Sequence, residues 1–533
     1  MIRPDLNQWT ASQSSHHFDV VVVGGGATGL GVAVQAALEG RRIALIEGRD
    51  FASGTSSRST KLLHGGVRYL AQGQFRLIQE ALRERSIMLK LAPHLAQPIP
   101  FVVAERKWSS WLVSSLGLNI YQMLSRNLSL GPTAGVSSKA LHQIAPTLPP
   151  AAAGVRYWDG QFDDARYAIA LAQTANAAGA MIRNHTLVTS LQNNAEGWTL
   201  GLRDSFDGTT SQIRTRCVVN ATGVWVDDLR HQLLTSPKTS GGASSSKHLS
   251  DRWVQPSQGV HLVVSREVLP LNEAVLVPRT RDGRVLFAIP WLGSIVIGTT
   301  DTPRNDAPLE PRPYSHELKF LFEESHRHLG VKLHISDIKS VWAGLRPLVN
   351  RTSDERTTSQ ISREHLIVRE QPGFITVTGG KWTTYRSMAE LVMKSLVESN
   401  DLPASSVHAQ TQNHALKGAP AFATHRLRDA PSLNLYGTAS AIIQDMTGPN
   451  DTIGLGLTEH MVRYSARNEW AVTVEDMLAR RWRALFLDAR MAKVMAPKVA
   501  RYLQAETGIN PQLHDFEILC DQYTLSEISQ GHD

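Results

Sequence analysis

The sequence has little cysteine and no long apolar run. Only Cys217 and Cys520 occur among its 533 residues. The two could form one disulfide, but such sparse use of cysteine is typical of a reducing compartment. No run of about 20 apolar residues is present, which argues against a transmembrane helix. Segment 1–17 is polar and lacks the apolar core of a signal peptide, so we expect a cytoplasmic protein.

The charge pattern lacks the usual features of nucleic-acid binding. Lys and Arg total 55 against 48 Asp and Glu, a net charge of +7. No zinc-ligand spacing, RNP-like aromatic motif or long basic run is present, so we expect no nucleic-acid partner and no metal. The basic excess could instead serve an anionic lipid surface or a phosphorylated substrate. The length predicts two or three domains.

A strand–turn–helix–strand unit stands near the start of the chain. Residues 18–23 are a β-branched run typical of a buried parallel strand, and residues 24–29 carry the pattern G-x-G-x-x-G. Residues 30–39 have helical composition, and residues 42–47 return to strand character. This order predicts a dinucleotide-binding β-α-β unit, with an unliganded glycine-rich turn as the alternative.

The three glycines and the acidic residue of this unit each have a physical role in binding a dinucleotide. Gly24 permits the tight turn, Gly26 lets the backbone approach the pyrophosphate, and Gly29 lets the helix pack close to the strand. The helix N-terminus offers free N–H groups to the anion. Glu47 ends the second strand, where it can accept both ribose hydroxyls and repel a 2′-phosphate. The ligand is therefore FAD or NAD rather than NADP.

Two distant segments favour FAD over NAD. Residues 220–225 (N-A-T-G-V-W) end a strand in small residues, as close packing beside a dinucleotide requires. Residues 378–384 (T-G-G-K-W-T-T) end another strand at a helix start, in a position suited to the far end of a flavin. Either segment alone could be an ordinary strand-to-helix turn. Together they indicate an extended cofactor, because a flavin dinucleotide crosses most of its domain.

The remaining patterns predict the architecture. Short strands recur at 260–264, 274–277, 285–289 and 294–298, which favours an antiparallel sheet beside a pocket. We predict an α/β Rossmann-type FAD-binding domain interleaved with an α+β substrate (cap) domain of antiparallel sheet, plus an α-helical C-terminal domain. The predicted boundaries are 18–92 with 151–230 and 340–399 for the FAD-binding domain, 93–150 with 251–339 for the cap, and 400–533 for the helical domain.

Several motifs together resemble one enzyme family. They are T-S-S-R-S-T-K-L-L-H-G-G-V-R-Y-L (55–70), F-D-D-A-R (162–166), I-G-T-T-D (297–301), W-A-G-L-R-P-L (342–348), G-G-K-W-T-T-Y-R (379–386) and the helical segment 467–481. Over about residues 18–506, the chain resembles the FAD-dependent, respiratory glycerol-3-phosphate dehydrogenases. The resemblance implies oxidation of sn-glycerol 3-phosphate to dihydroxyacetone phosphate, with a hydride passing to FAD and electrons to a quinone. Two features depart from the pattern: a longer Ser-rich segment near Ser240, and Arg58 where a small residue is commoner.

The resemblance also implies roles for individual residues. Arg346 is the expected phosphate ligand, because a planar guanidinium gives a phosphate two parallel hydrogen bonds. His261 is the expected base, with His64 as competitor, because histidine titrates near neutral pH. Lys381 could instead stabilise charge on the reduced flavin. The expected substrate ligands are Arg68, Tyr69, Arg346, Lys381 and Thr384. The expected cofactor ligands are Gly24, Gly26, Thr28, Gly29, Glu47, Thr55, Ser56, Ser57, Leu63, His64, Gly65, Gly66, Ala221, Gly223, Gly380, Lys381 and Thr383.

One segment could contact a membrane. Residues 108–124 are uncharged and rich in aromatic and aliphatic side chains, and basic residues flank them. They are either an interfacial helix, as delivery of electrons to membrane quinone would require, or a buried helix of the cap. We expect a peripheral protein on the inner face of the cytoplasmic membrane, one that could form a homodimer. An amino-acid or amine oxidase of the same fold that uses oxygen, and a non-catalytic nucleotide-binding module, remain the competing hypotheses.

Overall fold

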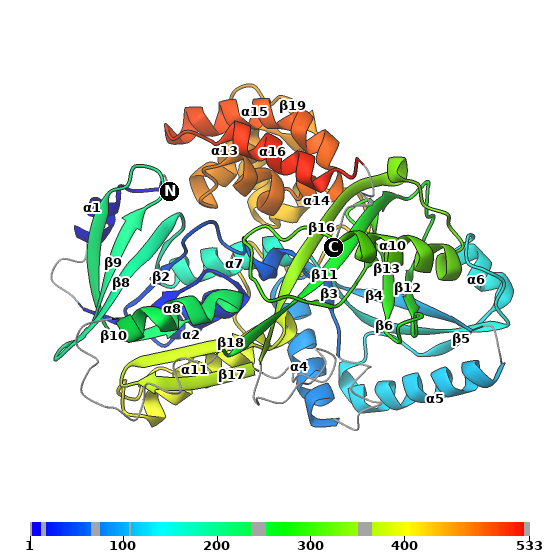
Figure 1. Cartoon of the computed structure of the whole chain (residues 1–533), viewed down its shortest axis with the longest axis horizontal. Helices are drawn as coiled ribbons and strands as arrows, with labels where there is room; N and C mark the ends of the chain where they lie inside the picture. The colour runs from blue at the N-terminus through cyan, green and yellow to red at the C-terminus, as the bar shows by residue number, and fades with distance from the viewer. Residues whose placement is uncertain are drawn as a thin grey trace.

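The chain forms two sheets with a helical layer across them (Figure 1). The computed structural model describes residues 3–11, 17–65, 75–105, 108–235, 252–349 and 365–526. Among these residues, no helix is long and apolar enough to cross a bilayer. Cys217 and Cys520 are both described, and both are buried and free.

The first sheet has eight strands and holds the dinucleotide-binding unit. Its central strands run parallel in the order β18-β10-β1-β2-β7, and β17, β9 and β8 pair antiparallel with their neighbours. The apolar valines of β1 are almost fully buried, as expected for a strand covered on both faces. Helix α2 packs between α7 and α11 on one face. The strands are β1 (Phe18–Val23), β2 (Ile43–Ile46), β7 (Met181–Arg183), β8 (Thr186–Asn194), β9 (Gly197–Asp204), β10 (Thr210–Asn220), β17 (His365–Gln371) and β18 (Phe374–Gly379). The helices are α1 (Leu6–Ala11), α2 (Ala27–Leu38), α7 (Asp164–Ala177), α8 (Val226–Thr235) and α11 (Tyr385–Glu398).

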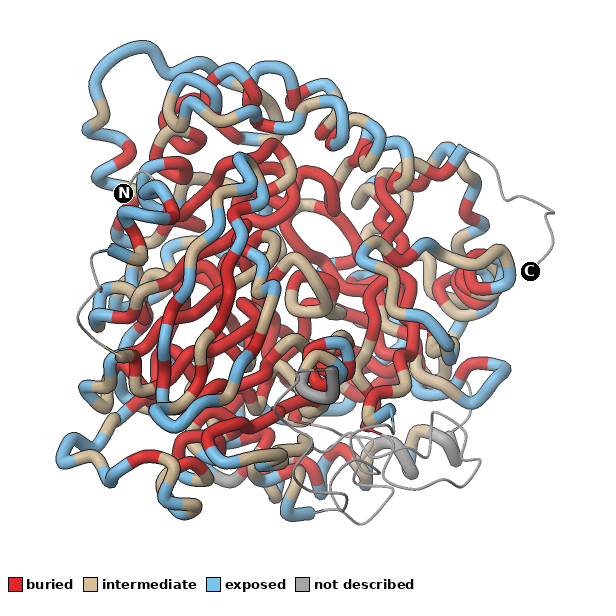
Figure 2. Tube along the Cα trace, turned by 60° about the vertical axis from the view of Figure 1, so that its left-hand side comes forward, coloured by how far each residue is buried: buried red, intermediate tan, exposed pale blue. Residues whose placement is uncertain are grey.

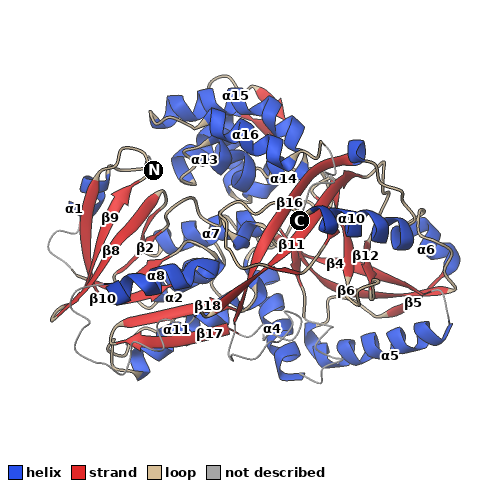
Figure 3. Cartoon of the chain, viewed as in Figure 1, coloured by secondary structure: helices blue, strands red, loops and turns tan. Residues whose placement is uncertain are grey.

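The second sheet has ten strands and is antiparallel except where β12 meets β4. It runs β15-β11-β14-β13-β12-β4-β6-β3, with β16 beside β11 and β5 beside β6. Helices lie against both sheets (Figure 3). The strands are β3 (Leu62–Leu63), β4 (Ala96–Glu105), β5 (Ala134–Ser137), β6 (Ala153–Phe162), β11 (Val254–Ser265), β12 (Ala274–Val277), β13 (Leu286–Trp291), β14 (Ser294–Gly298), β15 (Thr302–Pro303) and β16 (Ile338–Val349). The associated helices are α4 (Phe75–Leu91), α5 (Trp108–Ser125), α6 (Ser138–Ile144) and α10 (Ser315–Glu324).

The C-terminal region is helical and lies across both sheets at the top of Figure 1. Its buried side chains form a core of their own, and Trp291 and Trp342 of the second sheet pack into that core. Figure 2 shows buried residues gathered in the interior, with exposed residues on the outside. The helices are α12 (Ala439–Gln444), α13 (Glu459–Asn468), α14 (Ala484–Leu487), α15 (Ala489–Thr507) and α16 (Leu513–Tyr523), with a small hairpin of β19 (Thr452–Gly454) and β20 (Leu457–Thr458).

Most predicted elements are present. The antiparallel strands expected between residues 260 and 298 are confirmed as β11 to β14. The predicted domain boundaries remain predictions, although β6 and β16, from segments assigned to the FAD-binding domain, pair in the second sheet. The Ser-rich segment 236–250 lies outside the described residues.

Candidate active site

A cavity opens where β1, β2 and β10 end. Its lining includes seven of the predicted cofactor residues: Gly24, Gly26, Glu47, Thr55, Ser56, Ala221 and Gly223. It also includes Trp225 and Leu309, which the sequence did not single out as ligands. In a parallel sheet, ligands bind outside the carboxyl ends of the strands, as this cavity does. The position therefore matches the predicted dinucleotide site.

The glycines of the turn are required by close backbone approach. Gly24 has φ +111°, and a Cβ there would lie 2.5 Å from the carbonyl oxygen of Ala221. A Cβ on Gly29 would lie 1.9 Å from the carbonyl oxygen of Gly24, so Gly29 serves packing rather than lining the cavity. Gly26 lines the cavity and is the N-cap of α2, with no side-chain cap of its own. The turn thus leaves backbone N–H groups near the cavity, as a pyrophosphate requires.

Residues 53–63, here called the flavin loop, come close to this turn. The Ser56 hydroxyl accepts a hydrogen bond from the backbone N–H of Ala27, at 2.9 Å. The Thr55 hydroxyl donates to the carbonyl of Leu345 at 2.6 Å, and Trp382 Nε1 donates to the carbonyl of Ser56 at 2.8 Å. These bonds bring together three of the motifs quoted above, which lie more than 300 residues apart at their extremes.

Glu47 is fixed by the backbone around it. Its carboxylate accepts from the N–H of Gly25 at 2.6 Å and from the N–H of Arg49 at 2.8 Å. Burial raises the pKa of Glu47, and these two backbone donors oppose the rise. Each carboxylate oxygen keeps a second lone pair, so Glu47 can still accept from ribose hydroxyls.

The two segments that favoured FAD are neighbours in the fold. β10 and β18 pair in parallel, with Asn220 opposite Thr376. The Asn220 amide donates to Thr376 Oγ1 at 3.2 Å, and the Thr378 hydroxyl donates to the carbonyl of Gly223 at 3.0 Å. The cradle of glycines, the helix N-terminus and the Glu47 carboxylate fit FAD, with β10 and β18 along one side.

The other predicted cofactor residues that the structure describes do not line this cavity. Within the flavin loop, Leu63 is fully buried in the core and Ser57 is 1% exposed. Thr383 is also buried. The remaining members that do not line this cavity are Thr28, His64, Gly65, Gly380 and Lys381. Gly66, with the substrate candidates Arg68 and Tyr69, lies outside the described residues.

His261, the expected base, lies on β11 and is buried. β11 is covered on both faces, and His261 is 2% exposed. Its imidazole stacks on Trp342 with ring centres 4.1 Å apart. Nε2 shares a hydrogen bond with the Thr60 hydroxyl at 3.1 Å, and Nδ1 has no hydrogen-bond partner within the described part of the chain. Burial first, then the charges of Lys61 and Arg346, hold the pKa of His261 well below its usual range.

Arg346 lies on β16, the strand next to β11. Its guanidinium pairs with Asp301 at 3.3 Å and donates to Thr299 Oγ1 at 3.1 Å and to the carbonyl of Thr300 at 3.0 Å. A Cβ on Gly259 would lie 2.3 Å from Arg346 Nη2, so that glycine makes room for the guanidinium. The side chain is 26% exposed. The structure thus brings Arg346 and His261 onto adjacent strands beside the flavin loop.

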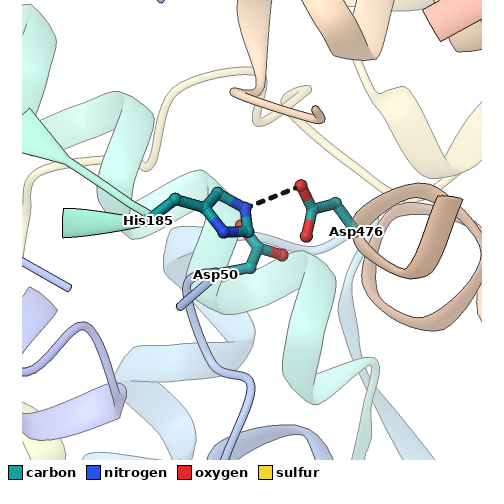
Figure 4. A group of neighbouring side chains, drawn as sticks. All are labelled: Asp50, His185 and Asp476. Atoms are coloured by element: carbon teal, nitrogen blue, oxygen red, sulfur yellow. Dashed lines mark hydrogen bonds and ion pairs between the residues drawn. The ribbon is translucent and has the colours of Figure 1, made fainter. Parts of the chain in front are cut away.

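A buried cluster nearby has the composition of a metal site but a different chemistry. Asp50, His185 and Asp476 converge, and His185 Nε2 lies 2.9 Å from Asp476 Oδ2 (Figure 4). Arg480 and Arg481 both contact the Asp50 carboxylate, and Arg480 also pairs with Asp476. Because guanidinium groups already neutralise both carboxylates, the cluster is an ion-pair network that joins the C-terminal region to the loop after β2.

Comparisons with known proteins bear on this geometry. A model of FAD dependent oxidoreductases matches residues 19–392, and a model of the C-terminal domain of alpha-glycerophosphate oxidase matches residues 410–513. A mitochondrial glycerol-3-phosphate dehydrogenase of Arabidopsis thaliana is 35% identical over 93% of this chain and 84% of its own. The human mitochondrial enzyme is 34% identical over 93% of this chain and 71% of its own. The chain belongs to the glycerol-3-phosphate dehydrogenase family of FAD-dependent oxidoreductases.

Solved structures agree with this fold. A glycerol-3-phosphate dehydrogenase from Bacillus halodurans, solved with FAD, superposes with a TM-score of 0.74 at 24% identity and covers 99% of this chain and 98% of its own. The predicted family, fold class, enzyme class and FAD cofactor are confirmed. A glycine oxidase from Geobacillus kaustophilus has a TM-score of 0.52 at 21% identity and covers 76% of this chain and 99% of its own. That likeness is one of fold alone, so the amino-acid oxidase hypothesis is not favoured.

Proposed function

We propose that this member of the family oxidises sn-glycerol 3-phosphate to dihydroxyacetone phosphate, and that its electrons pass to a quinone. The observation that supports the proposal most is the pairing of β11 with β16, since Arg346 lies opposite Ser257 and its guanidinium lies against Gly259, two residues before His261. A phosphate monoester with an adjacent secondary alcohol needs both groups: a cation for its dianion and a base for its hydroxyl.

Arg346 is proposed to bind the phosphate. Asp301 and Thr299 hold its guanidinium in one orientation, so little side-chain freedom is lost when the substrate binds. Its partly exposed side chain leaves access for phosphate oxygens. Lys381 and Thr384, which follow β18, are proposed as further ligands. The other proposed ligands are Arg68 and Tyr69.

His261 is proposed to take the hydroxyl proton. Its low pKa keeps the imidazole neutral at neutral pH, the form that a base requires. When Nε2 donates to Thr60, Nδ1 carries a lone pair and can accept the proton from the C2 hydroxyl. FAD, when bound, supplies the flavin N5 that receives the hydride from C2.

The test of this function is anaerobic reduction of the bound flavin. We expect the purified yellow protein to lose its flavin absorbance on addition of glycerol 3-phosphate, to lose it far more slowly with glycerol, and to keep it with glycine. The variant His261→Gln should bind FAD but bleach far more slowly. Bleaching by glycine and not by glycerol 3-phosphate would support the amino-acid oxidase hypothesis and overturn this one.

We also propose that α5 seats the enzyme on a membrane, where it meets quinone. One face of α5 packs inward: Leu118 and Tyr121 are buried, and Trp111 Nε1 donates to the carbonyl of Gly154 at 3.0 Å. The opposite face exposes an apolar stripe of Leu112 (61%), Leu116 (65%), Ile120 (37%) and Met123 (75%). Spacings of four, four and three residues align these side chains along the helix. An apolar face of this kind with basic flanks suits the interface of an anionic bilayer, which would make the enzyme peripheral on the inner face of the cytoplasmic membrane.

A further inference from the structure

Lys61 is a fully buried cation that the proposed chemistry does not use. It lies in the flavin loop, its side chain is 0% exposed, and its Nζ donates to Asp164 Oδ2 and to the carbonyl of Ser57, both at 2.7 Å. Ser59 binds the same Asp164 oxygen through its N–H and its hydroxyl. Asp164 therefore gathers three donors from one short loop and holds the loop's conformation.

A second buried cation reaches this point from the C-terminal region. Arg483 precedes α14, and its Nη2 donates to the carbonyl of Ser57 at 2.8 Å and to Asp164 Oδ1 at 3.2 Å. Arg483 is also 0% exposed. Lys61 and Arg483 thus share two acceptors, although 422 residues separate them in the sequence.

This arrangement lies directly behind His261. Thr60, the residue before Lys61, holds the histidine Nε2. The Lys61 Nζ is 4.6 Å from the ring centre of Trp342, and the His261 ring stacks on the same indole at 4.1 Å. The ammonium and the imidazole therefore lie within about 9 Å of each other, close enough for a buried charge to act on a titration.

We propose that Lys61, braced by Arg483, is a positioning residue for the oxidation: it fixes Thr60 against His261 and places a positive charge behind the imidazole that disfavours its protonation. The proposal rests on the proposed function only in treating His261 as the base. It also gives the C-terminal region a part in the reaction, through a residue that does not touch the substrate.

The charges around His261 come from five places in the chain. Lys61 lies in the flavin loop and Arg346 lies on β16. Asp301, which follows β14 and precedes β15, pairs with Arg346. The α7 end supplies Asp163 and Asp164, and the residue before α14 supplies Arg483. Burial lowers the pKa of Lys61 to about 7 against the attraction of Asp164, so Lys61 keeps its proton at acidic pH. Removal of this charge should raise the pKa of His261.

The first test is the pH profile of kcat/KM. Lys61→Met should move the acidic limb to higher pH by about one unit, the size expected for one charge within about 9 Å at an effective dielectric constant of about 20. Lys61→Arg, which keeps the charge, should leave the limb in place. Arg467→Ala, which breaks an exposed ion pair with Glu506 in the same C-terminal region, is the matched control. A lower rate with the acidic limb at an unchanged pH would mean that Lys61 only supports the loop. That result would overturn the proposal.

The second test reads His261 directly, without turnover. In FAD-bound protein labelled with 13C-histidine, the His261 signal is the one that His261→Gln removes. The midpoint of the His261 titration should rise in Lys61→Met. If that variant does not fold, Lys61→Gln replaces it, because its amide can still donate to Asp164, and the midpoint should rise there too. Identical titration in variant and parent would overturn the proposal. If His261→Gln retains full activity while the midpoint still shifts, the proposed base is wrong and the action of Lys61 on His261 stands.

Discussion

The apolar stripe on α5 gives a prediction whose size follows from exposure. Full burial of one Leu or Met side chain is worth about 1.5–3 kcal/mol. Leu112, Leu116 and Met123 are 61%, 65% and 75% exposed, so each has most of that area available for a membrane. Changing all three to Ser should remove about 4 kcal/mol of membrane affinity, or roughly a 1000-fold fall in partitioning. Trp111 is left intact, because its indole bonds to β6 and supports the fold.

The assay is flotation with vesicles that contain anionic lipid, beside activity with a soluble dye and with quinone in the same vesicles. The triple variant should stay in the soluble fraction, keep dye activity and lose quinone activity. Its thermal midpoint should be unchanged, because the substituted side chains are exposed. The control is Val494→Ser, at an apolar residue on α15 that is 71% exposed. Helix α15 lies at the top of Figure 1, away from α5 at the lower right. Equal flotation of variant and parent would refute the reasoning, and a change from dimer to monomer would assign the stripe to a second copy of the chain.

Two further predictions concern the cofactor and the phosphate. Gly26→Val should give folded, colourless protein, because even a Cβ there lies 3.1 Å from Ser56 Oγ and a larger side chain occupies the space of the pyrophosphate; stoichiometric FAD in the purified variant would contradict this. Arg346→Ala should cost about 3 kcal/mol of substrate binding, or about a 100-fold rise in KM for glycerol 3-phosphate. The much weaker reaction with glycerol is the control, and an equal loss for both substrates would mean that Arg346 does not bind the phosphate.

Local patterns predicted the parts of the fold that local forces determine. The strand at 18–23 has the predicted bounds, because its run of β-branched residues lies within one segment. Helix α2 begins at Ala27 rather than Leu30, since the glycine-rich first turn receives support from outside. That support is Ser56 Oγ, from 29 residues further along the chain. A single segment carries no sign of such a partner.

The site itself depended more on tertiary packing. Strand pairing brings His261 opposite Trp342, a pairing that alternation along β11 could not predict. Lys61 lay inside a motif quoted for its resemblance, yet its role requires Asp164 and Arg483, whose proximity only the fold reveals. The segment 108–124 was predicted as either interfacial or buried, and α5 is buried on one face and exposed on the other.

The ion pairs of Asp50 have a thermodynamic consequence for the assembly of the molecule. Arg480 and Arg481 form ion pairs with Asp50. Ala52 and Ser53, two and three residues after Asp50, line the cofactor cavity. The docking of the C-terminal helices and the binding of FAD therefore order the same short loop. Such coupling is reciprocal: the factor by which packing of the C-terminal helices raises the affinity for FAD equals the factor by which bound FAD favours that packing. We therefore expect a chain without FAD to hold its C-terminal helices less firmly than the chain with FAD bound.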